Sequence, residues 1–144
     1  MEQRFSFFAM YGVNDIWQIK ENFRPPVFIV ILDEIGDILL QDKEKELEKI
    51  LLRLLQKGRA AGIYVIAATQ RPSVNIMSGI LKANFPARLS FRVGSKIDSQ
   101  VILDEPGAEN LQNKGDALFR NSMVPLTRLQ VAFADVQTNS LKEN

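Results

Sequence analysis

The fold of this chain is decided by the stretch Val27-Phe28-Ile29-Val30-Ile31-Leu32-Asp33-Glu34. Its six consecutive apolar residues are rich in β-branched and aromatic side chains, which predicts a strand buried on both faces of a parallel sheet. Two adjacent carboxylates, Asp33 and Glu34, follow at the carboxyl end of the strand, where open α/β sheets bind their ligands. In nucleoside triphosphatases this arrangement is a Walker B site, in which the first acid holds Mg²⁺ and the second polarises the attacking water. The alternative is a buried strand that merely ends in a helix-capping Asp.

A Walker B site works together with a phosphate loop, and this sequence contains none. The pattern G-x-x-x-x-G-K-[ST] requires a Gly followed by Lys, and none of the eight glycines is followed by Lys. The backbone N–H nest and the Lys that hold the phosphates are therefore missing. We expect the chain to be part of a larger motor, or to be a relative that no longer binds nucleotide.

Composition limits the chemistry that this protein can perform. The 144 residues predict one domain that buries roughly two-thirds of its unfolded surface. The absence of Cys and His excludes disulfides, thiolate nucleophiles, Ser-His triads and His-based metal sites. A net charge of +1 means that any nucleic-acid surface must be a local cluster. No apolar run approaches the ~20 residues that span a bilayer, so we expect a cytoplasmic chain, although a parent protein could be anchored to the cytoplasmic membrane.

Helical periodicity is clearest in the segment that starts near Asp42 and stops at Gly62. Apolar side chains recur there at helical spacing, which predicts one buried stripe made of Leu47, Ile50, Leu51, Leu54 and Leu55. A first helix is predicted over 2–11, before Pro25-Pro26 leads into the strand.

A second apolar strand is predicted over 64–69, and it also ends in polar residues. Beyond it we predict, in order, a helix capped by Ser73, a strand with one polar face over 87–93, a short helix capped by Asp98, and strands at 117–119 and 127–133. This alternation predicts an α/β fold with a parallel sheet flanked by helices. The expected organisation is a helical lead-in at 1–26, the sheet domain at 27–136 and a polar tail at 137–144.

Several motifs span about residues 27–119 in unbroken order: Leu32-Asp33-Glu34-Ile35-Gly36-Asp37, Gly58-Arg59-Ala60-Ala61-Gly62-Ile63, Ala68-Thr69-Gln70-Arg71-Pro72-Ser73, Leu81-Lys82-Ala83-Asn84-Phe85-Pro86, Ser95-Lys96-Ile97-Asp98-Ser99, Ile102-Leu103-Asp104 and Gly115-Asp116-Ala117-Leu118. In this order and spacing they resemble the motor domain of the FtsK/SpoIIIE family of DNA translocases. The resemblance implies a RecA-like, P-loop NTPase-type sheet that is partial, because the phosphate-loop strand is lacking. It also implies a ring of identical subunits, a hexamer, that uses ATP to move double-stranded DNA in chromosome segregation or DNA transfer.

The resemblance assigns roles around a bound ATP. Asp33 becomes the Mg²⁺-side acid, Glu34 the base that activates water, Gln70 the sensor of the γ-phosphate and Thr69 a nucleotide contact. Adjacent parallel strands would place Glu34 and Gln70 within reach of one water. Arg59 becomes the arginine finger that reaches the ATP of the next subunit. Taken alone, Gln70 is an exposed turn residue and Arg59 a cation at a helix C-terminus.

Three basic residues resemble the contacts that the family makes to the DNA backbone: Arg71, Lys82 and Lys96. They fall on separate loops or element ends, which suits phosphate tracking without base readout. No aromatic residue lies beside them to stack bases, which argues against single-strand binding. Each could equally be a solvated surface charge.

The sequence leaves three interpretations open. The leading one is part of a DNA translocase motor that binds ATP and Mg²⁺ only with a phosphate-loop half, and is inactive as an ATPase alone. Related ring ATPases serve conjugation or type VII secretion, which would change the cargo. A degenerate module that regulates an intact motor is the third. One departure bears on hydrolysis, because Gln100 stands where the family usually has Arg.

Overall fold

The computed structural model describes residues 1–74 and 76–133. The chain divides into two compact units, Met1–Phe85 and Pro86–Asn144. The first unit contains α1 (Glu2–Met10), the 3₁₀ turns η1 (Ile16–Gln18) and η2 (Glu21–Phe23), β1 (Phe28–Leu32), α2 (Ile35–Gln41), α3 (Glu46–Ala61), β2 (Ile63–Ala67) and α4 (Gly79–Asn84). The second contains β3 (Arg88–Ser90), α5 (Lys96–Leu103), η3 (Ala108–Asn110), β4 (Asp116–Arg120) and β5 (Thr127–Gln130). None of the described helices has the length and apolar character needed to cross a membrane.

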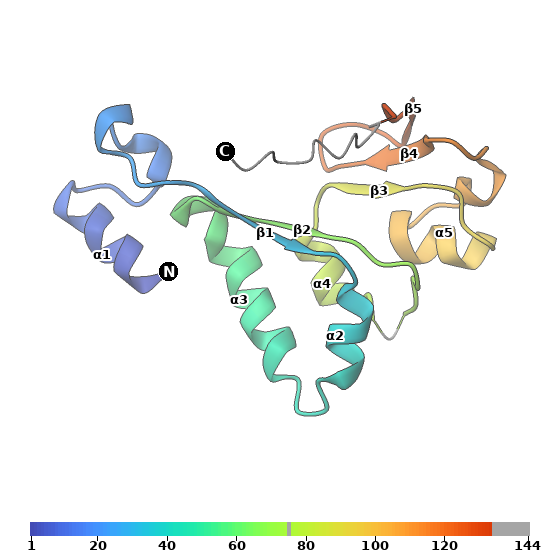
Figure 1. Ribbon diagram of the computed structural model, residues 1–144, viewed down its shortest axis with the longest axis horizontal. Helices are drawn as coiled ribbons and strands as arrows, with labels where there is room; N and C mark the ends of the chain where they lie inside the picture. The colour runs from blue at the N-terminus through green and yellow to red at the C-terminus, as the bar shows by residue number, and fades with distance from the viewer. Residues whose placement is uncertain (75, 134–144) are drawn as a thin grey trace, which may run out of the picture. The chain divides into compact units, whose positions relative to one another are not determined.

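A parallel strand pair forms the centre of the first unit (Figure 1). β1 and β2 run side by side in a register that starts at Phe28 opposite Ile63 and ends at Leu32 opposite Ala67. The chain between them forms α2 and α3, and α3 packs against β2. The predicted parallel sheet flanked by helices is confirmed by this arrangement.

Buried apolar side chains from three helices hold this unit together. Ile35, Leu51 and Leu81 form a buried cluster, and Leu32 and Val65 of the strands pack against it. Only part of the predicted stripe of α3 is buried, since Leu47 and Ile50 are exposed. The helix therefore turns a narrower apolar face to its neighbours than the spacing predicts.

The ends of α3 are fixed by capping interactions. The backbone N–H groups of Glu46 and Glu48 donate to the carboxylate of Asp42, at 3.0 and 2.9 Å. Asp42 therefore stands outside α3, which begins later than predicted. At the other end Gly62 has φ +71° and donates its N–H to the carbonyls of Arg59 and Gly58, as the sequence predicts for a C-terminal stop.

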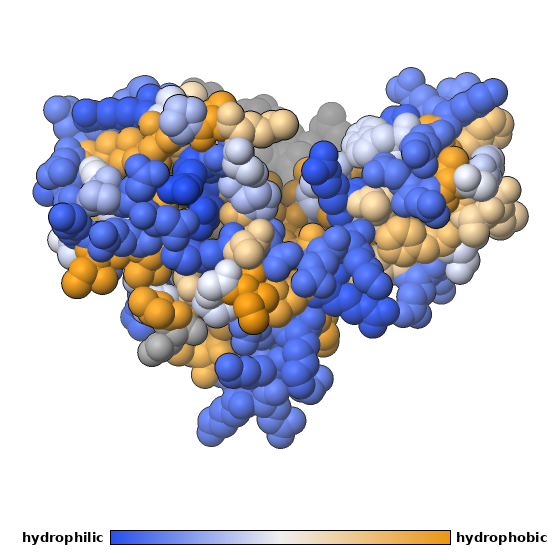
Figure 2. Space-filling view, turned by 180° about the vertical axis from the view of Figure 1, so that it is seen from behind, coloured by the Kyte–Doolittle hydropathy of each residue, from blue (hydrophilic) through white to orange (hydrophobic). Residues whose placement is uncertain are grey.

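The prediction that β1 is buried on both faces is wrong for the described residues. Ile29 is 63 % exposed, Ile31 70 %, and Ile66 of β2 56 %. These residues alternate with Val30 and Leu32, which are partly buried. One face of the strand pair thus contacts the helices and the other remains open. Figure 2 shows hydrophobic patches between hydrophilic ones on one face of the molecule.

The N-terminal segment is bound to the C-terminal end of α3. Arg4 Nε donates to the carbonyl of Ala61 and Arg4 Nη2 to that of Pro26, both at 2.6 Å. The indole Nε1 of Trp17 donates to the hydroxyl of Tyr64 at 3.0 Å. Residues 1–26 therefore belong to the same compact unit as β1 and β2.

The second unit is built on an antiparallel sheet with the order β3-β4-β5. Its core contains Leu103, Ala108, Leu111 and Leu118. β3 was expected in the parallel sheet, but it pairs with β4 instead. It is also shorter than the predicted strand over 87–93, and β5 ends before residue 133.

Two helix caps differ from the predicted ones. Ser95 caps α5 by accepting the N–H of Asp98 at 3.1 Å, and Asp98 lies inside the helix. Ser78 caps α4, accepting the N–H of Leu81 at 3.3 Å, rather than Ser73. In both cases a hydroxyl residue three positions before the bound N–H makes the cap, which is the usual N-cap spacing.

A buried carboxylate fixes the β4–β5 hairpin. Asp116 accepts from Arg128 Nε at 2.9 Å and from Arg128 Nη2 at 2.6 Å, and it also accepts the N–H of Gln112. The side-chain hydrogen bonds from Arg128 and the backbone one from Gln112 lower the pKa of Asp116 to about 2. The charged form of this carboxyl is therefore favoured by the folded hairpin.

Candidate functional site

The polar residues that follow β1 and β2 lie at one edge of the strand pair. Backbone pairing continues beyond the strands, because Ala68 N–H donates to Leu32 O at 2.8 Å and Ile35 N–H to Ala68 O at 2.9 Å. These bonds bring the segment of Asp33 and Glu34 beside that of Thr69. The predicted meeting of the two strand ends is therefore seen in the first unit.

Three donors hold the carboxylate of Glu34. The hydroxyl of Thr69 donates to Oε1 at 2.5 Å, the N–H of Gly36 to Oε1 at 3.0 Å, and the N–H of Gln70 to Oε2 at 2.8 Å. Glu34 is also the N-cap residue of α2. Its side chain thus links the start of this helix to the segment after β2.

The same contacts determine the charge state of Glu34. The Thr69 hydroxyl and then the Gln70 N–H lower the pKa of this carboxyl, the Gly36 N–H and the positive charge of Arg71 lower it further, and desolvation opposes them. Because each donor binds the charged form, the carboxylate is ionised and held in one orientation. A carboxylate in this state can accept a further hydrogen bond from a water molecule, provided that a lone pair of one of its oxygens points toward the water.

Gly36 leaves the space that the Glu34 carboxylate occupies. A Cβ at this position would lie 2.8 Å from Glu34 Oε1, 3.2 Å from Thr69 Oγ1 and 3.0 Å from Ile76 Cδ1. Ile76 is buried, so its side chain has little room to move away from such a group. The short distance to Oε1 explains why a residue without a side chain stands here.

Asp33 differs from its neighbour Glu34. Its residue is exposed, and among the described residues it has no hydrogen-bond or ion-pair partner. The described residues contain no cluster of three carboxylate, His or Cys groups that could hold a metal on its own. Mg²⁺ is often held by one or two protein carboxylates together with the phosphates of a substrate. The carboxylate of Asp33 fits an ion held in this way.

Gln70 and Arg59 are both exposed residues of the first unit. Gln70 meets Glu34 through its backbone N–H. Arg59 lies in the last turn of α3, and its carbonyl accepts the N–H of Gly62. The structure therefore brings Asp33, Glu34, Thr69 and Gln70 together, and it leaves Arg59 at the other end of β2 from them.

The three basic candidates occupy separate elements. Arg71 is exposed, its N–H donates to Thr69 Oγ1 at 3.1 Å, and its charge acts on Glu34. Lys82 lies in the last turn of α4 and is partly buried. Lys96 is the exposed first residue of α5 in the second unit. Of the three, Arg71 is directly connected to the Glu34 site.

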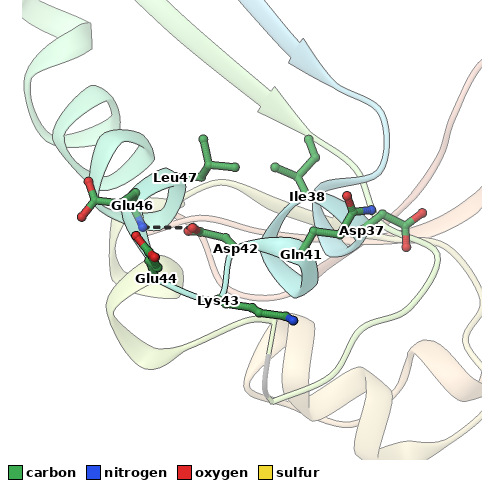
Figure 3. Close-up of a pocket in the computed structure, with 8 residues that line it drawn as sticks. All are labelled: Asp37, Ile38, Gln41, Asp42, Lys43, Glu44, Glu46 and Leu47. Atoms are coloured by element: carbon green, nitrogen blue, oxygen red, sulfur yellow. Dashed lines mark hydrogen bonds between the residues drawn. The ribbon is translucent and has the colours of Figure 1, made fainter.

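A pocket of about 530 Å³ lies elsewhere in the first unit (Figure 3). Its lining side chains come from α2, the loop after it and the start of α3, and they include Asp37, Ile38, Asp42, Glu44 and Leu47. None of the predicted site residues lines it. The pocket is therefore separate from the site at the strand ends.

Sequence reasoning predicted that Glu34 and the residues after β2 would lie close together, but it missed the bond between Glu34 and Thr69. It also gave Gly36 no role. The capping bond from the Gly36 N–H to Glu34 has no strong signal in the sequence, because Glu is not among the residues preferred at an N-cap.

Comparison with known proteins identifies the family of this chain. The sequence model of the FtsK/SpoIIIE family matches residues 2–74. A DNA translocase FtsK of Caldanaerobacter subterraneus subsp. tengcongensis is 43% identical over 100% of this chain and 21% of the relative. The corresponding protein of Lactococcus lactis subsp. lactis is 44% identical over 92% of the chain and 19% of the relative. The chain spans about a fifth of the length of these curated relatives.

Solved structures share the fold. The pCW3 conjugation coupling protein TcpA, in a monomer form with ATPγS, matches with a TM-score of 0.77 and 24% identity over 90% of this chain and 40% of that protein. The cytoplasmic domain of the type VII secretion ATPase EccC of Thermomonospora curvata matches with a TM-score of 0.80 and 20% identity over 91% of this chain and 16% of that one. This likeness shows the fold, and the family match and the relatives confirm the resemblance found in the sequence motifs. The chain belongs to the FtsK/SpoIIIE family.

Proposed function

We propose that this chain is part of the motor of an ATP-driven translocase of double-stranded DNA. In this proposal it supplies the Walker B acids, the sensor, the arginine finger and the DNA-contacting loops. The phosphate loop, which this sequence does not contain, comes from another part of the motor, and the assembled ring works in the cytoplasm. The relatives named DNA translocase FtsK support this function for the larger protein, of which this chain matches about a fifth.

The observation that carries the proposal is the position of Glu34. Its ionised carboxylate stands at the carboxyl end of β1, beside the segment that follows β2, where α/β sheets bind ligands. In the assembled motor this carboxylate would orient the water that attacks the γ-phosphate and accept its proton. The side chain of Gln70, on the adjacent exposed segment, would contact the same phosphate.

Mg²⁺ and Arg59 complete the proposed site. The free carboxylate of Asp33 would hold the ion, whose charge would offset that of the phosphates. Arg59 is exposed at the end of α3, as a residue that reaches the nucleotide of a neighbouring subunit must be. Its guanidinium stays charged and can bind two phosphate oxygens at once. A ring of identical subunits, which we take to be a hexamer, follows from this role.

DNA is the proposed cargo because the basic residues Arg71, Lys82 and Lys96 lie on separate segments of the chain, which suits contacts to backbone phosphates. The conjugation coupling protein and the type VII secretion ATPase share the fold of this chain. A shared fold alone does not favour conjugation or secretion as the function of this chain. A module that regulates an intact motor would lack turnover but would keep the fold.

Nucleotide binding tests the proposal directly. The chain is titrated with a fluorescent ATP analogue and Mg²⁺, with and without a supplied phosphate-loop half of the motor. Binding that requires the added half supports a split motor. The absence of binding in both mixtures would contradict the proposal and favour the regulatory module.

The role of Glu34 is tested by Glu34→Gln in the assembled motor. We expect hydrolysis to fall by roughly 10²–10⁴-fold, because a general base is lost, while ATP binding is retained. Glu44→Gln is the matched control, since Glu44 is an exposed acid in the loop before α3. Retained turnover in Glu34→Gln would exclude Glu34 as the base.

A further inference from the structure

The guanidinium of Arg59 is not held in place by another side chain of the described residues. Arg59 is exposed, and within residues 1–74 and 76–133 its side chain makes no hydrogen bond or ion pair. Its direction therefore depends on the backbone of the last turn of α3, which carries it. Whatever fixes this turn also fixes the place from which Arg59 can reach another molecule.

The last turn of α3 ends in carbonyl groups that need hydrogen-bond donors, because the final four carbonyls of a helix have no partner inside it. Gly62 donates its N–H to the carbonyls of Arg59 and Gly58. The carbonyl of Ala61, a fully buried residue, accepts instead from Arg4 Nε at 2.6 Å. An unpaired buried carbonyl is costly, so the turn would have to move toward water if this donor were lost.

Arg4 links the end of α3 to two other segments. Its Nη2 donates to the carbonyl of Pro26 at 2.6 Å, and its guanidinium lies over the ring of Phe28, 5.0 Å from the ring centroid. Phe28 is the first residue of β1, and Arg4 itself belongs to α1. The planar guanidinium suits this position, because it presents several donors in fixed directions and a face that stacks on a ring.

We propose that Arg4 is a positioning residue that holds the last turn of α3 in the place from which Arg59 reaches a phosphate of the neighbouring subunit's nucleotide. The inference rests on the proposed function, which takes Arg59 as the arginine finger. It adds that the N-terminal segment determines where the finger stands. Arg4 touches neither nucleotide nor Mg²⁺, and it acts only through the backbone that carries Arg59.

A second arginine provides a matched control. Arg53 also connects α3 to α1, since its Nη2 pairs with Glu2 Oε1 at 2.7 Å. Both side chains of this pair are exposed, and Arg53 lies in the middle of α3 rather than in its last turn. Arg53→Met and Arg4→Met each remove a guanidinium between the same two helices. Only Arg4→Met removes the donor of the Ala61 carbonyl.

Hydrogen exchange in the whole chain tests the hold on the last turn. The N–H of Gly62 is followed by NMR, because it bonds the carbonyls of that turn. In Arg4→Met we expect it to exchange roughly tenfold faster, as for the loss of one hydrogen bond from a charged group. In Arg53→Met it should stay unchanged. An unchanged Gly62 exchange in Arg4→Met would overturn the inference.

Turnover of the assembled motor then tests whether Arg4 acts through Arg59. In Arg4→Met we expect kcat for ATP to fall roughly 10–100-fold, as for a misplaced catalytic group, while KM changes by less than about twofold. Arg53→Met should leave both unchanged. In the double variant Arg4→Met/Arg59→Ala, kcat should be no lower than in Arg59→Ala alone, because no finger is left to position. A merely structural role of Arg4 would lower it further.

The outcomes separate this inference from the proposed function. A further fall of kcat in the double variant, or an unchanged kcat in Arg4→Met while Arg59→Ala is inactive, would overturn the inference and leave the finger in place. Full turnover in Arg59→Ala would refute the finger, and its positioning by Arg4 with it. If Arg4→Met does not fold, judged by urea unfolding, Arg4→Lys takes its place in both comparisons. It keeps the charge and one donor, so the same changes should appear in smaller size, and their absence would overturn the inference.

Discussion

Gly62 allows a quantitative test of how the N-terminal segment packs on α3. The residue has φ +71°, and a Cβ there would overlap Cδ1 of the buried Ile16 and lie 3.3 Å from Arg4 Nη2. A left-handed backbone costs a residue with a side chain about 1–2 kcal/mol. Forcing a methyl group against a packed core side chain costs a further 1–3 kcal/mol or so. We therefore expect Gly62→Ala to destabilise the first unit by about 2–5 kcal/mol.

Gly12 supplies the matched control for this substitution. Its φ is +67°, almost the same as that of Gly62, but a Cβ would meet nothing within 4 Å. Gly12→Ala should therefore cost only the backbone strain, about 1–2 kcal/mol. The difference between the two variants measures the overlap with Ile16.

Urea unfolding followed by the fluorescence of Trp17 is the assay. Trp17 is the single tryptophan of the chain and lies in the first unit, so the signal reports that unit alone. The expected order of midpoints is original chain, then Gly12→Ala, then Gly62→Ala. Equal midpoints for the two variants would refute the packing of Ile16 against the end of α3.

Two further predictions concern the hairpin and the open face of the strand pair. The pKa of Asp116 is lowered from 3.8 to about 2, so the stability that its charged form adds is complete above pH 3.8 and is lost as the pH falls through about 2. Asp116→Asn should remove this stability. The difference in stability between the variant and the original chain, measured by hydrogen exchange of the β4 amides, should therefore shrink as the pH falls over that range. A difference that does not depend on pH would contradict the assignment. Ile31 is 70 % exposed on the open apolar face of the strand pair, and we expect the chain to self-associate through this face. Ile31→Lys should therefore reduce self-association in sedimentation velocity. Ile97→Lys is the control and should reduce it less, because Ile97 is similarly exposed, at 68 %, but lies on α5. A chain that is monomeric at all concentrations would contradict this expectation.

The elements with strong periodicity could be predicted from the sequence. β1, β2 and α3 carry long apolar patterns and were predicted at nearly their observed positions. The helix α2 was missed, because Gly36 and Asp37 weaken its intrinsic propensity and its start depends on the Glu34 side chain. Local capping outweighed propensity at this position.

The placement of β3 could also have been inferred more closely. The segment over 87–93 alternates apolar and polar residues, a pattern typical of antiparallel sheets, whereas the strands of parallel sheets are apolar throughout. The structure follows this rule and pairs β3 with β4. The apolar run of β1 predicts burial on two sides, but the described residues cover one of them.

For the candidate site, the sequence predicted which segments meet, because the carboxyl ends of adjacent parallel strands share one edge. It could not predict that Thr69 and the Gln70 N–H would bind Glu34, since these bonds depend on how the chain turns after β2. The bond to Arg71 depends on the same turn.

The two strand pairings described above differ in how far apart their members lie along the chain. Phe119 of β4 pairs with Thr127 of β5 across a short turn, whereas Phe28 of β1 pairs with Ile63 of β2 across the whole of α2 and α3. Closing the longer loop costs more entropy before any contact rewards it, so pairing of this kind is slow relative to a local hairpin. The Glu34 carboxylate can accept the hydrogen bond of the Thr69 hydroxyl only after β1 and β2 have paired. We therefore expect the candidate site to form late in folding, after the helices that separate its two halves.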